Sequence, residues 1–195
     1  MKACLLAACL CLTLLPARAQ GVPAPPKPRV ELQTSCGPVV VELEPALAPD
    51  TVKNFLRYVD EGFYSDTIFH RVIQGFMVQG GGLTRELVEK PAHEAIPLEA
   101  AAAFKGGLRN LRGALAMART QAPDSATAQF FIDTVDNPAL DPGPDGPGYC
   151  VFGRVVAGMD AVDKIEKVRT VWRHGMANVP EYPVYIRSAQ RVAGP

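Results

Sequence analysis

Short apolar segments of strand length, separated by glycine and proline, are the feature that most restricts the fold of this 195-residue chain. Their aromatic and β-branched residues favour strands, and each run is shorter than an ordinary helix. Repeated interruption by turn-forming residues is typical of an all-β barrel or sandwich. The clearest examples are TIFHRVI (67–73), FMVQGG (76–81), GALAMAR (113–119), QFFIDT (129–134) and YCVFGRVV (149–156).

The flanking regions predict further elements. RVELQT (29–34) and VVVELEP (39–45) surround a turn sequence, so the domain should begin with two paired strands, and VYIRSAQ (184–190) predicts the last strand. Apolar residues at helical spacing predict one helix within 48–63 and a second near 158–168. Two helices in a mainly β chain suit a closed barrel whose open ends are covered.

Residues with helix-end preferences flank the first predicted helix. Asp50 or Thr51 is expected to cap the first helix, and Gly62 is expected to end it. The stretch 85–109 contains four successive alanines and a glycine pair, and no element is assigned to it. It is long for a connection in a compact domain, and such loops are often functional.

The N-terminus is expected to be an export signal rather than part of the fold. Residues 1–19 combine a positive start, an uncharged apolar run and a small-x-small cleavage pattern, which is typical of a signal peptide. Residues 20–28 hold four prolines and are expected to form a flexible lead, followed by a domain over 29–195. We favour a periplasmic location with cleavage after Ala19 over lipid attachment at Cys9, because the apolar run continues beyond that cysteine.

Cleavage would remove Lys2 and Arg18, leaving 18 basic and 20 acidic residues and a formal charge of −2. Without a basic excess, nucleic acid is not an expected partner. The mature protein is expected to be a monomer that does not insert into the membrane. It would retain Cys36 and Cys150, which could pair in an oxidising compartment, although we favour two unpaired thiols.

The common catalytic constellations are poorly supported. The three histidines do not have the spacing of a zinc site, so the sequence does not predict metal binding. The sequence also contains neither a phosphate-binding loop motif nor a nucleophile-elbow motif. Neither metal nor organic cofactor is therefore expected. His70 could act as a general base, but a strand histidine satisfied by its neighbours is the favoured interpretation.

Arg71 lies in an apolar, aromatic strand segment, which is costly unless the side chain is paired or functional. Simple alternation puts Phe69, Arg71 and Ile73 on one face of the strand and His70 and Val72 on the other. A structural alternative is an arginine that extends to the rim of the barrel. In the later segment, alternation assigns Phe130 to the core and Phe131 to the opposite face.

The chain closely resembles the cyclophilins. FHRVIQGFMVQGG (69–81) is similar to the family signature nearly residue for residue, and GALAMAR (113–119), QFFI (129–132) and VFGRV (151–155) match further blocks in order. The similarity runs from about Val30 to Val192 and is closest to the periplasmic cyclophilins of Gram-negative bacteria. It implies a closed eight-stranded antiparallel β-barrel capped by two α-helices, with peptidyl-prolyl cis-trans isomerase activity on exported proteins and a role in their folding.

The resemblance also implies roles for individual residues in binding proline-containing unfolded or partly folded proteins. Arg71 corresponds to the catalytic arginine. Ala139 stands where many members have a tryptophan that contacts cyclosporin, so weak sensitivity to this drug is expected. The residues expected to bind substrate are Phe76, Met77, Phe131 and Leu140 around the proline, Gln79 and Gln129 as polar contacts, Ala118 and Arg119 through their backbone, and Tyr149 at the rim.

Two other functions stay open from the sequence alone. The chain could be a cyclophilin-shaped binding module or chaperone that holds proline segments without isomerising them. It could also be a secreted β-barrel scaffold in which Arg71 is buried for structural reasons. The orientation of Arg71 relative to Phe76, Met77 and Phe131 separates the scaffold from the other two functions.

Overall fold

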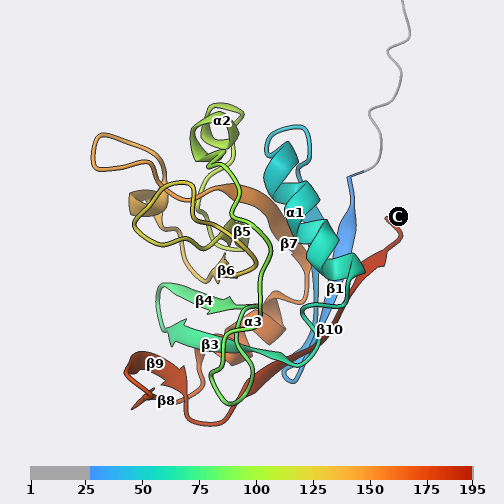
Figure 1. The fold of residues 1–195 in the computed structure, drawn as a ribbon, viewed down its shortest axis with the longest axis vertical. Coiled ribbons are helices and arrows are strands. Elements are labelled where there is room, and N and C mark those ends of the chain that lie inside the picture. Colours follow the sequence, from blue (N-terminus) through green and yellow to red (C-terminus); the bar gives the residue numbers. More distant parts are fainter. Residues whose placement is uncertain (1–26, 195) are drawn as a thin grey trace, which may run out of the picture.

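Eight antiparallel strands close into a barrel in the order β1-β10-β3-β4-β6-β5-β7-β2 (Figure 1). The computed structural model describes residues 27–194, so the predicted signal peptide, Cys9 and most of the 20–28 segment lie outside the described residues. The barrel strands are β1 (Arg29–Thr34), β2 (Gly37–Leu43), β3 (Thr67–Ile73), β4 (Met77–Gly80), β5 (Ala114–Met117), β6 (Phe130–Asp133), β7 (Val151–Ala157) and β10 (Val184–Val192).

The predicted opening hairpin is confirmed. β1 and β2 pair along their whole length and are joined by the two-residue turn Ser35–Cys36. Val30 and Leu32 of β1 are fully buried while their neighbours are more exposed, which is the alternation of a sheet with one face on the core. The strands thereby line the barrel interior with β-branched and aliphatic side chains.

Aromatic side chains fill the centre of the barrel. The Phe55 ring lies 5.7 Å from that of Phe130 in an edge-to-face arrangement, and 5.2 Å from the ring of Phe152. Tyr64 packs edge-on against Phe130 at 5.5 Å and donates its hydroxyl hydrogen to the Ala128 carbonyl. Because Phe55 belongs to a helix and the two phenylalanines it touches belong to strands, this cluster anchors the helix to the barrel.

The two predicted helices are present, with a third, shorter one that was not expected. α1 (Pro49–Asp60) and α3 (Met159–Glu166) both bury their apolar faces in the barrel core. The extra helix α2 (Ala100–Lys105) is formed by the alanine run of the connection to which no element was assigned. A single 3₁₀ turn, η1 (Pro138–Leu140), follows β6.

The start of α1 differs from the expected side-chain cap. Neither Asp50 nor Thr51 caps the helix, which begins at Pro49. Instead the Glu99 carboxylate accepts hydrogen bonds from the Asp50 N–H at 3.1 Å and the Thr51 N–H at 2.8 Å. At the other end Gly62 follows the C-cap residue Glu61 and adopts a φ of 67°. A glycine with positive φ at this position commonly ends a helix, as expected for Gly62.

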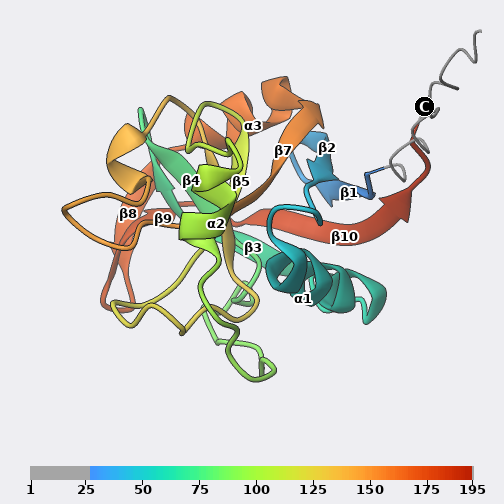
Figure 2. The ribbon, with the colours of Figure 1, turned by 90° about the horizontal axis from the view of Figure 1, so that it is seen from above.

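A separate two-stranded hairpin lies outside the barrel and was not predicted. β8 (Thr170–Arg173) pairs with β9 (Met176–Pro180) through a turn at His174–Gly175. Figures 1 and 2 both place this hairpin beside β3. It connects α3 to the last barrel strand.

Cys36 in the first turn and the buried Cys150 are both free thiols. Burial raises the pKa of Cys150 to about 11. Among residues 27–194, no helix combines the length and apolar character needed to span a bilayer.

Candidate active site

β3 carries Arg71 and contains an irregularity just before it. Phe69 is paired with Gly80 and Arg71 with Gln79, so His70 is an extra residue in β3. A β-bulge of this kind interrupts the alternation of side chains and is common next to active sites. Phe69 consequently points into the barrel core, whereas Arg71 faces outward. The expectation that these two residues share a face is therefore wrong.

Arg71 lines a cavity of about 160 Å³ on the outer surface of the barrel. Cofactor sites usually enclose roughly 300–1,000 Å³, so this cavity has the size for a single side chain. Its lining comes from strands and loops far apart in sequence. The lining residues are Arg71, Phe76, Met77, Gln79, Ala118, Arg119, Phe131, Leu140 and Tyr149.

Nine of the ten predicted site residues therefore surround one cavity. The apolar part forms a second cluster, separate from the barrel core, in which Met77 and Phe131 are buried and Phe76 and Leu140 pack against them. The assignment of Phe131 to the site is consistent with this placement. The geometry brings Arg71 and these apolar groups together, which disfavours the scaffold alternative.

A chain of hydrogen bonds fixes the polar side of the cavity. Arg71 Nη1 donates to Gln79 Oε1 at 3.3 Å, and Gln79 Nε2 donates to Gln129 Oε1 at 3.0 Å. Gln129, the tenth predicted residue, thus stands behind the cavity wall. Its own Nε2 donates to Glu89 Oε1 at 3.5 Å. Glu89 was not predicted, because nothing in its local sequence distinguishes it from an ordinary surface glutamate.

Gly82 makes room for this chain of polar groups. A Cβ atom at this position would collide with the Gln129 side chain. Glycine allows such a close approach of the backbone to a neighbouring side chain because it has no Cβ atom. Any larger residue would displace Gln129 and so disturb the contact with Gln79.

The opposite wall is built on Arg119 and Tyr149. The Arg119 guanidinium lies 4.7 Å from the centre of the Tyr149 ring, and its Nε and Nη2 donate to the Gly148 carbonyl. Tyr149 also meets Phe131 edge-on at 5.5 Å, and its N–H donates to the Leu140 carbonyl. This wall is held rigidly because each of its side chains has a defined partner.

Asn137 connects two parts of the apolar wall from behind. Its Nδ2 donates to the Phe76 carbonyl at 2.9 Å and to Asp133 Oδ1 at 2.7 Å. The Leu140 N–H donates to the Asn137 carbonyl at 2.9 Å. One buried asparagine therefore links the turn that carries Phe76 to the turn that carries Leu140. Asn137 was not predicted, because an asparagine before a proline is typical of an ordinary loop.

The histidine alternative gains no support. His70 is buried and does not line the cavity. Burial lowers its pKa to about 4, so the ring is neutral at physiological pH. Its Nδ1 has no hydrogen-bond partner within the described residues, while hydrogen bonds with Ile68 and Gln129 partly oppose the lowering of its pKa. The expected strand histidine satisfied by its neighbours is therefore found only in part. Within residues 27–194, no three His, Cys, Asp or Glu side chains converge on a common point for a metal ion.

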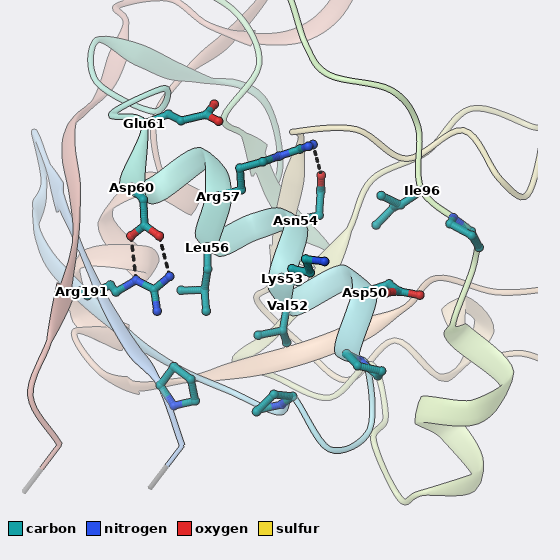
Figure 3. Close-up of a pocket in the computed structure, with 14 residues that line it drawn as sticks. Asp50, Val52, Lys53, Asn54, Leu56, Arg57, Asp60, Glu61, Ile96 and Arg191 are labelled. Atoms are coloured by element: carbon teal, nitrogen blue, oxygen red, sulfur yellow. Dashed lines mark hydrogen bonds and ion pairs between the residues drawn. The ribbon is translucent and has the colours of Figure 1, made fainter. Parts of the chain in front are cut away.

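A larger cavity of about 830 Å³ lies elsewhere, against α1 (Figure 3). Val52 and Leu56 line it, but both are already packed into the core. Asp60 and Arg191 at its edge form a two-point ion pair with distances of 2.6 and 2.7 Å. None of the predicted site residues reaches this cavity, and its Asp60 and Arg191 are already paired with each other. The larger of these two cavities is therefore not the candidate active site.

Comparison with known proteins decides the family. Residues 29–191 match the family model described as cyclophilin type peptidyl-prolyl cis-trans isomerase. The chain belongs to this family. It is a cyclophilin-type isomerase, as the motifs around Arg71 predicted.

Individual relatives agree with the family match. The chain is 46% identical over 186 residues to peptidyl-prolyl cis-trans isomerase A of Dickeya dadantii, covering 95% of this chain and 96% of the relative. It is 53% identical over 163 residues to peptidyl-prolyl cis-trans isomerase B of Escherichia coli, covering 82% and 96%. A Cryptosporidium parvum cyclophilin solved in the presence of the dipeptide Ala-Pro matches with a TM-score of 0.70 and 25% identity, covering 85% and 99%.

Proposed function

We propose that this cyclophilin accelerates rotation about X-Pro bonds in exported proteins, with Arg71 as its catalytic residue, and thereby assists their folding in the periplasm. The observation that carries the proposal is a permanently charged guanidinium beside a small apolar cavity. The other cavity residues would bind the substrate, as their family counterparts are expected to do. No cofactor enters this mechanism.

The reaction has a barrier but no leaving group. Rotation about an amide costs about 18–20 kcal/mol because the planar form has partial double-bond character. X-Pro isomers are nearly balanced in energy but exchange in tens to hundreds of seconds. An enzyme therefore needs only to bind the twisted amide better than either planar form.

The cavity can provide this preference in two ways. Twisting breaks the resonance, so the amide becomes less dipolar and is better tolerated beside Phe76, Met77, Phe131 and Leu140. Twisting also localises a lone pair on the proline nitrogen, to which Arg71 can donate a hydrogen bond. The contact with Gln79 Oε1 through Nη1 would hold the guanidinium in place for that bond.

The substrate chain would lie across the cavity in an extended form. The Ala118 N–H already donates to the Gln129 carbonyl at 3.0 Å, so this part of the wall is fixed. Ala118 and Arg119 line the cavity, and we propose that their backbone binds the substrate chain. Proline-containing unfolded proteins are the proposed partners, and the enzyme is proposed to act as a monomer.

The decisive experiment compares wild type with Arg71→Ala in a protease-coupled or line-shape assay of X-Pro exchange. A charge-assisted hydrogen bond contributes roughly 1.5–3 kcal/mol, so turnover should fall about ten- to a hundredfold. Arg187→Ala removes an exposed arginine on β10 and serves as the control.

The fold of both variants is checked by circular dichroism and thermal unfolding. Arg71→Lys should recover little activity, because an ammonium group lacks the planar array of donors. Near-normal turnover in Arg71→Ala would refute the catalytic role. If wild type bound proline peptides without isomerising them, the chain would instead be a binding module.

A further inference from the structure

Two large aromatic side chains are left in solvent near the β8–β9 hairpin. Trp172 on β8 is 72% exposed, and Tyr182, two residues beyond β9, is 79% exposed. Tryptophan is on average a highly buried residue type, and apolar side chains gathered on one surface commonly mark interaction sites. The barrel core and the site described above account for neither of them.

The hairpin lies along the part of β3 that leads to Arg71. β10 pairs with β3 only as far as Val184 opposite Phe69. Because the two strands are antiparallel, the residues before Val184 continue in the direction of Arg71, and Tyr182 is among them. Figures 1 and 2 both show β8 and β9 beside β3. A chain leaving the cavity on this side would therefore meet the hairpin.

The turn between β3 and β4 is tied to the helix that precedes the hairpin. The Gly75 N–H donates to Glu166 Oε1 at 2.8 Å. Gly75 immediately precedes Phe76, which lines the cavity, and Glu166 is the last residue of α3. This contact gives the cavity and the hairpin a fixed spacing.

The segment 167–183, which contains the hairpin, has more basic than acidic residues, and Glu166 directly precedes it. Residues 167–183 contain Lys167, Arg169 and Arg173 but only one acid, Glu181, whereas the whole chain has no net formal charge. Arg169 approaches Glu181 at 3.5 Å, and the partner of Arg173 among residues 27–194 is the Glu181 backbone carbonyl. Neither Lys167 nor Arg173 forms an ion pair within the described residues, and Arg173 directly follows Trp172 in the sequence.

The hairpin is rigid enough to present these groups. Its turn residues His174 and Gly175 have φ angles of 48° and 78°, the positive pair that matches the natural twist of a two-residue hairpin. Val179 is buried and lies opposite Val171, which fixes the inner face against the barrel. Docking onto a preformed surface costs little conformational entropy.

From these observations we infer that the β8–β9 hairpin, with Tyr182, is a docking surface for the substrate chain beyond its proline, selecting unfolded segments that carry aromatic and acidic side chains. The inference rests on the proposed function, because it extends the substrate path from the same cavity. Trp172 and Tyr182 would stack on apolar or aromatic side chains, and Lys167 and Arg173 would attract carboxylates. A short proline peptide would not reach the hairpin.

Trp172 provides a direct probe because it is the only tryptophan of the chain. An acidic proline-containing peptide of about 20 residues that lacks tryptophan would be titrated into the protein while the Trp172 emission is recorded. Binding should shift the Trp172 emission to shorter wavelength. A tetrapeptide substrate should leave the emission unchanged.

The titration distinguishes binding of the long peptide from no binding and from binding to a membrane surface. An unchanged spectrum at saturating long peptide would overturn the inference. A shift with anionic phosphatidylglycerol vesicles, but none with the peptide, would also overturn it and would make the hairpin a membrane-surface contact. Repeating the titration with a peptide in which the acids are replaced by glutamine should weaken binding severalfold.

A kinetic comparison separates this inference from the proposed function. The double variant Trp172→Ala/Tyr182→Ala should keep normal kcat/KM on the tetrapeptide but show about a five- to tenfold higher KM on the long acidic peptide. Val88→Ala, which shortens another exposed apolar side chain, is the matched control. Equal effects on both substrates, or none, would overturn the inference. If the wild-type protein showed no isomerase activity on either substrate, the proposed function would be refuted. The fluorescence titration would still show whether the hairpin binds the long peptide.

Discussion

Asp133 is a buried carboxyl group directly beneath the proposed proline cavity. It is paired with Met77 across the sheet, and its Oδ1 accepts the Asn137 hydrogen bond. Its Oδ2 is buried without a partner in the described part of the chain. Burial raises the pKa of Asp133 to about 7, opposed by the Asn137 hydrogen bond and reinforced by the negative charges of Asp141 and Asp136. The group is therefore largely neutral in mildly acidic solution.

This environment predicts a pH-dependent effect of Asp133→Asn on stability. In the unfolded chain the carboxyl ionises near pH 4, whereas in the folded protein it keeps its proton until about pH 7. The folded state thus binds more protons between these values, and wild type loses stability as the pH rises through this window. The asparagine variant lacks that loss, so its Tm relative to wild type should rise between pH 4 and 7 and then level off.

Thermal unfolding followed by circular dichroism at several pH values checks this. Asp145→Asn, in an exposed loop, is the control and should show no such trend. A Tm difference between Asp133→Asn and wild type that stays constant from pH 4 to pH 8 would contradict the buried, protonated carboxyl.

Ala139 gives a second prediction at the level of a single residue. It is exposed in η1, one residue before Leu140, and offers no large flat surface beside the cavity. We expect cyclosporin to inhibit this enzyme weakly. Ala139→Trp should strengthen inhibition by at least about tenfold, or 1.4 kcal/mol, by adding an aromatic surface and an indole donor.

The measurement is a dose–response curve for isomerase inhibition, with Ala46→Trp as a control for an added exposed tryptophan. Tight inhibition of wild type at drug concentrations comparable to that of the enzyme would show that the residue at 139 does not set sensitivity.

Residue-level prediction from sequence succeeded where the strand is regular and failed where it is not. Alternation assigned Phe130 to the core and Phe131 to the opposite face, and the two are buried in separate clusters. The same reasoning misplaced Phe69, because the extra residue His70 shifts the alternation. A bulge depends on pairing with β4, so one strand's sequence does not reveal it.

At the level of elements, the N-terminus of α1 depends on a distant side chain. Three groups of this helix donate to the Glu99 carboxylate, including the Thr51 hydroxyl at 2.7 Å. Helix N-termini have unsatisfied N–H groups and a partial positive charge, so a carboxylate stabilises them in two ways. Glu99 lies immediately before α2, and the contact therefore also fixes the 85–109 connection against α1.

We predict that Glu99→Ala destabilises the protein by about 1–2 kcal/mol, the usual cost of losing a helix cap. For a domain of this size that lowers Tm by about 2–4 °C per kcal/mol. Glu99→Gln should lose less because it keeps an acceptor oxygen, and Glu94→Ala, at an exposed position, should have little effect. Denaturant unfolding measures all three, and equal stabilities for Glu99→Ala and Glu94→Ala would exclude the capping role.

The elements that sequence reasoning found are those whose own residues determine them. α1 and α3 carry full helical periodicity, and β3 coincides with its predicted segment. The missed α2 and β8–β9 hairpin are only a few residues long, and such short elements are marginal alone. They are stabilised by packing against the barrel, which local sequence does not encode.

At the scale of the whole molecule, barrel closure assembles the candidate site. Arg71 and Tyr149 are far apart in sequence but line the same cavity. Residue types and spacing alone indicated that Arg71 was unusual, whereas its partners came from the resemblance to the cyclophilins. Pairing between distant strands is a property of the complete barrel, and a single sequence contains little direct information about it.

The full chain begins with a predicted export signal. If residues 1–19 are a cleaved signal peptide, expression of the full chain in a Gram-negative bacterium should yield a periplasmic protein that begins at Gln20, as measured by N-terminal mass spectrometry of the periplasmic fraction. Cys9→Ser should be exported and cleaved like wild type, because that cysteine leaves with the signal. Incorporation of labelled palmitate that Cys9→Ser abolishes would demonstrate a lipoprotein, and a cytoplasmic protein retaining Met1 would exclude export. Cytoplasmic retention would separate the enzyme from periplasmic substrates, whereas a lipid anchor would hold it at a membrane surface. Neither result would change the chemistry at Arg71.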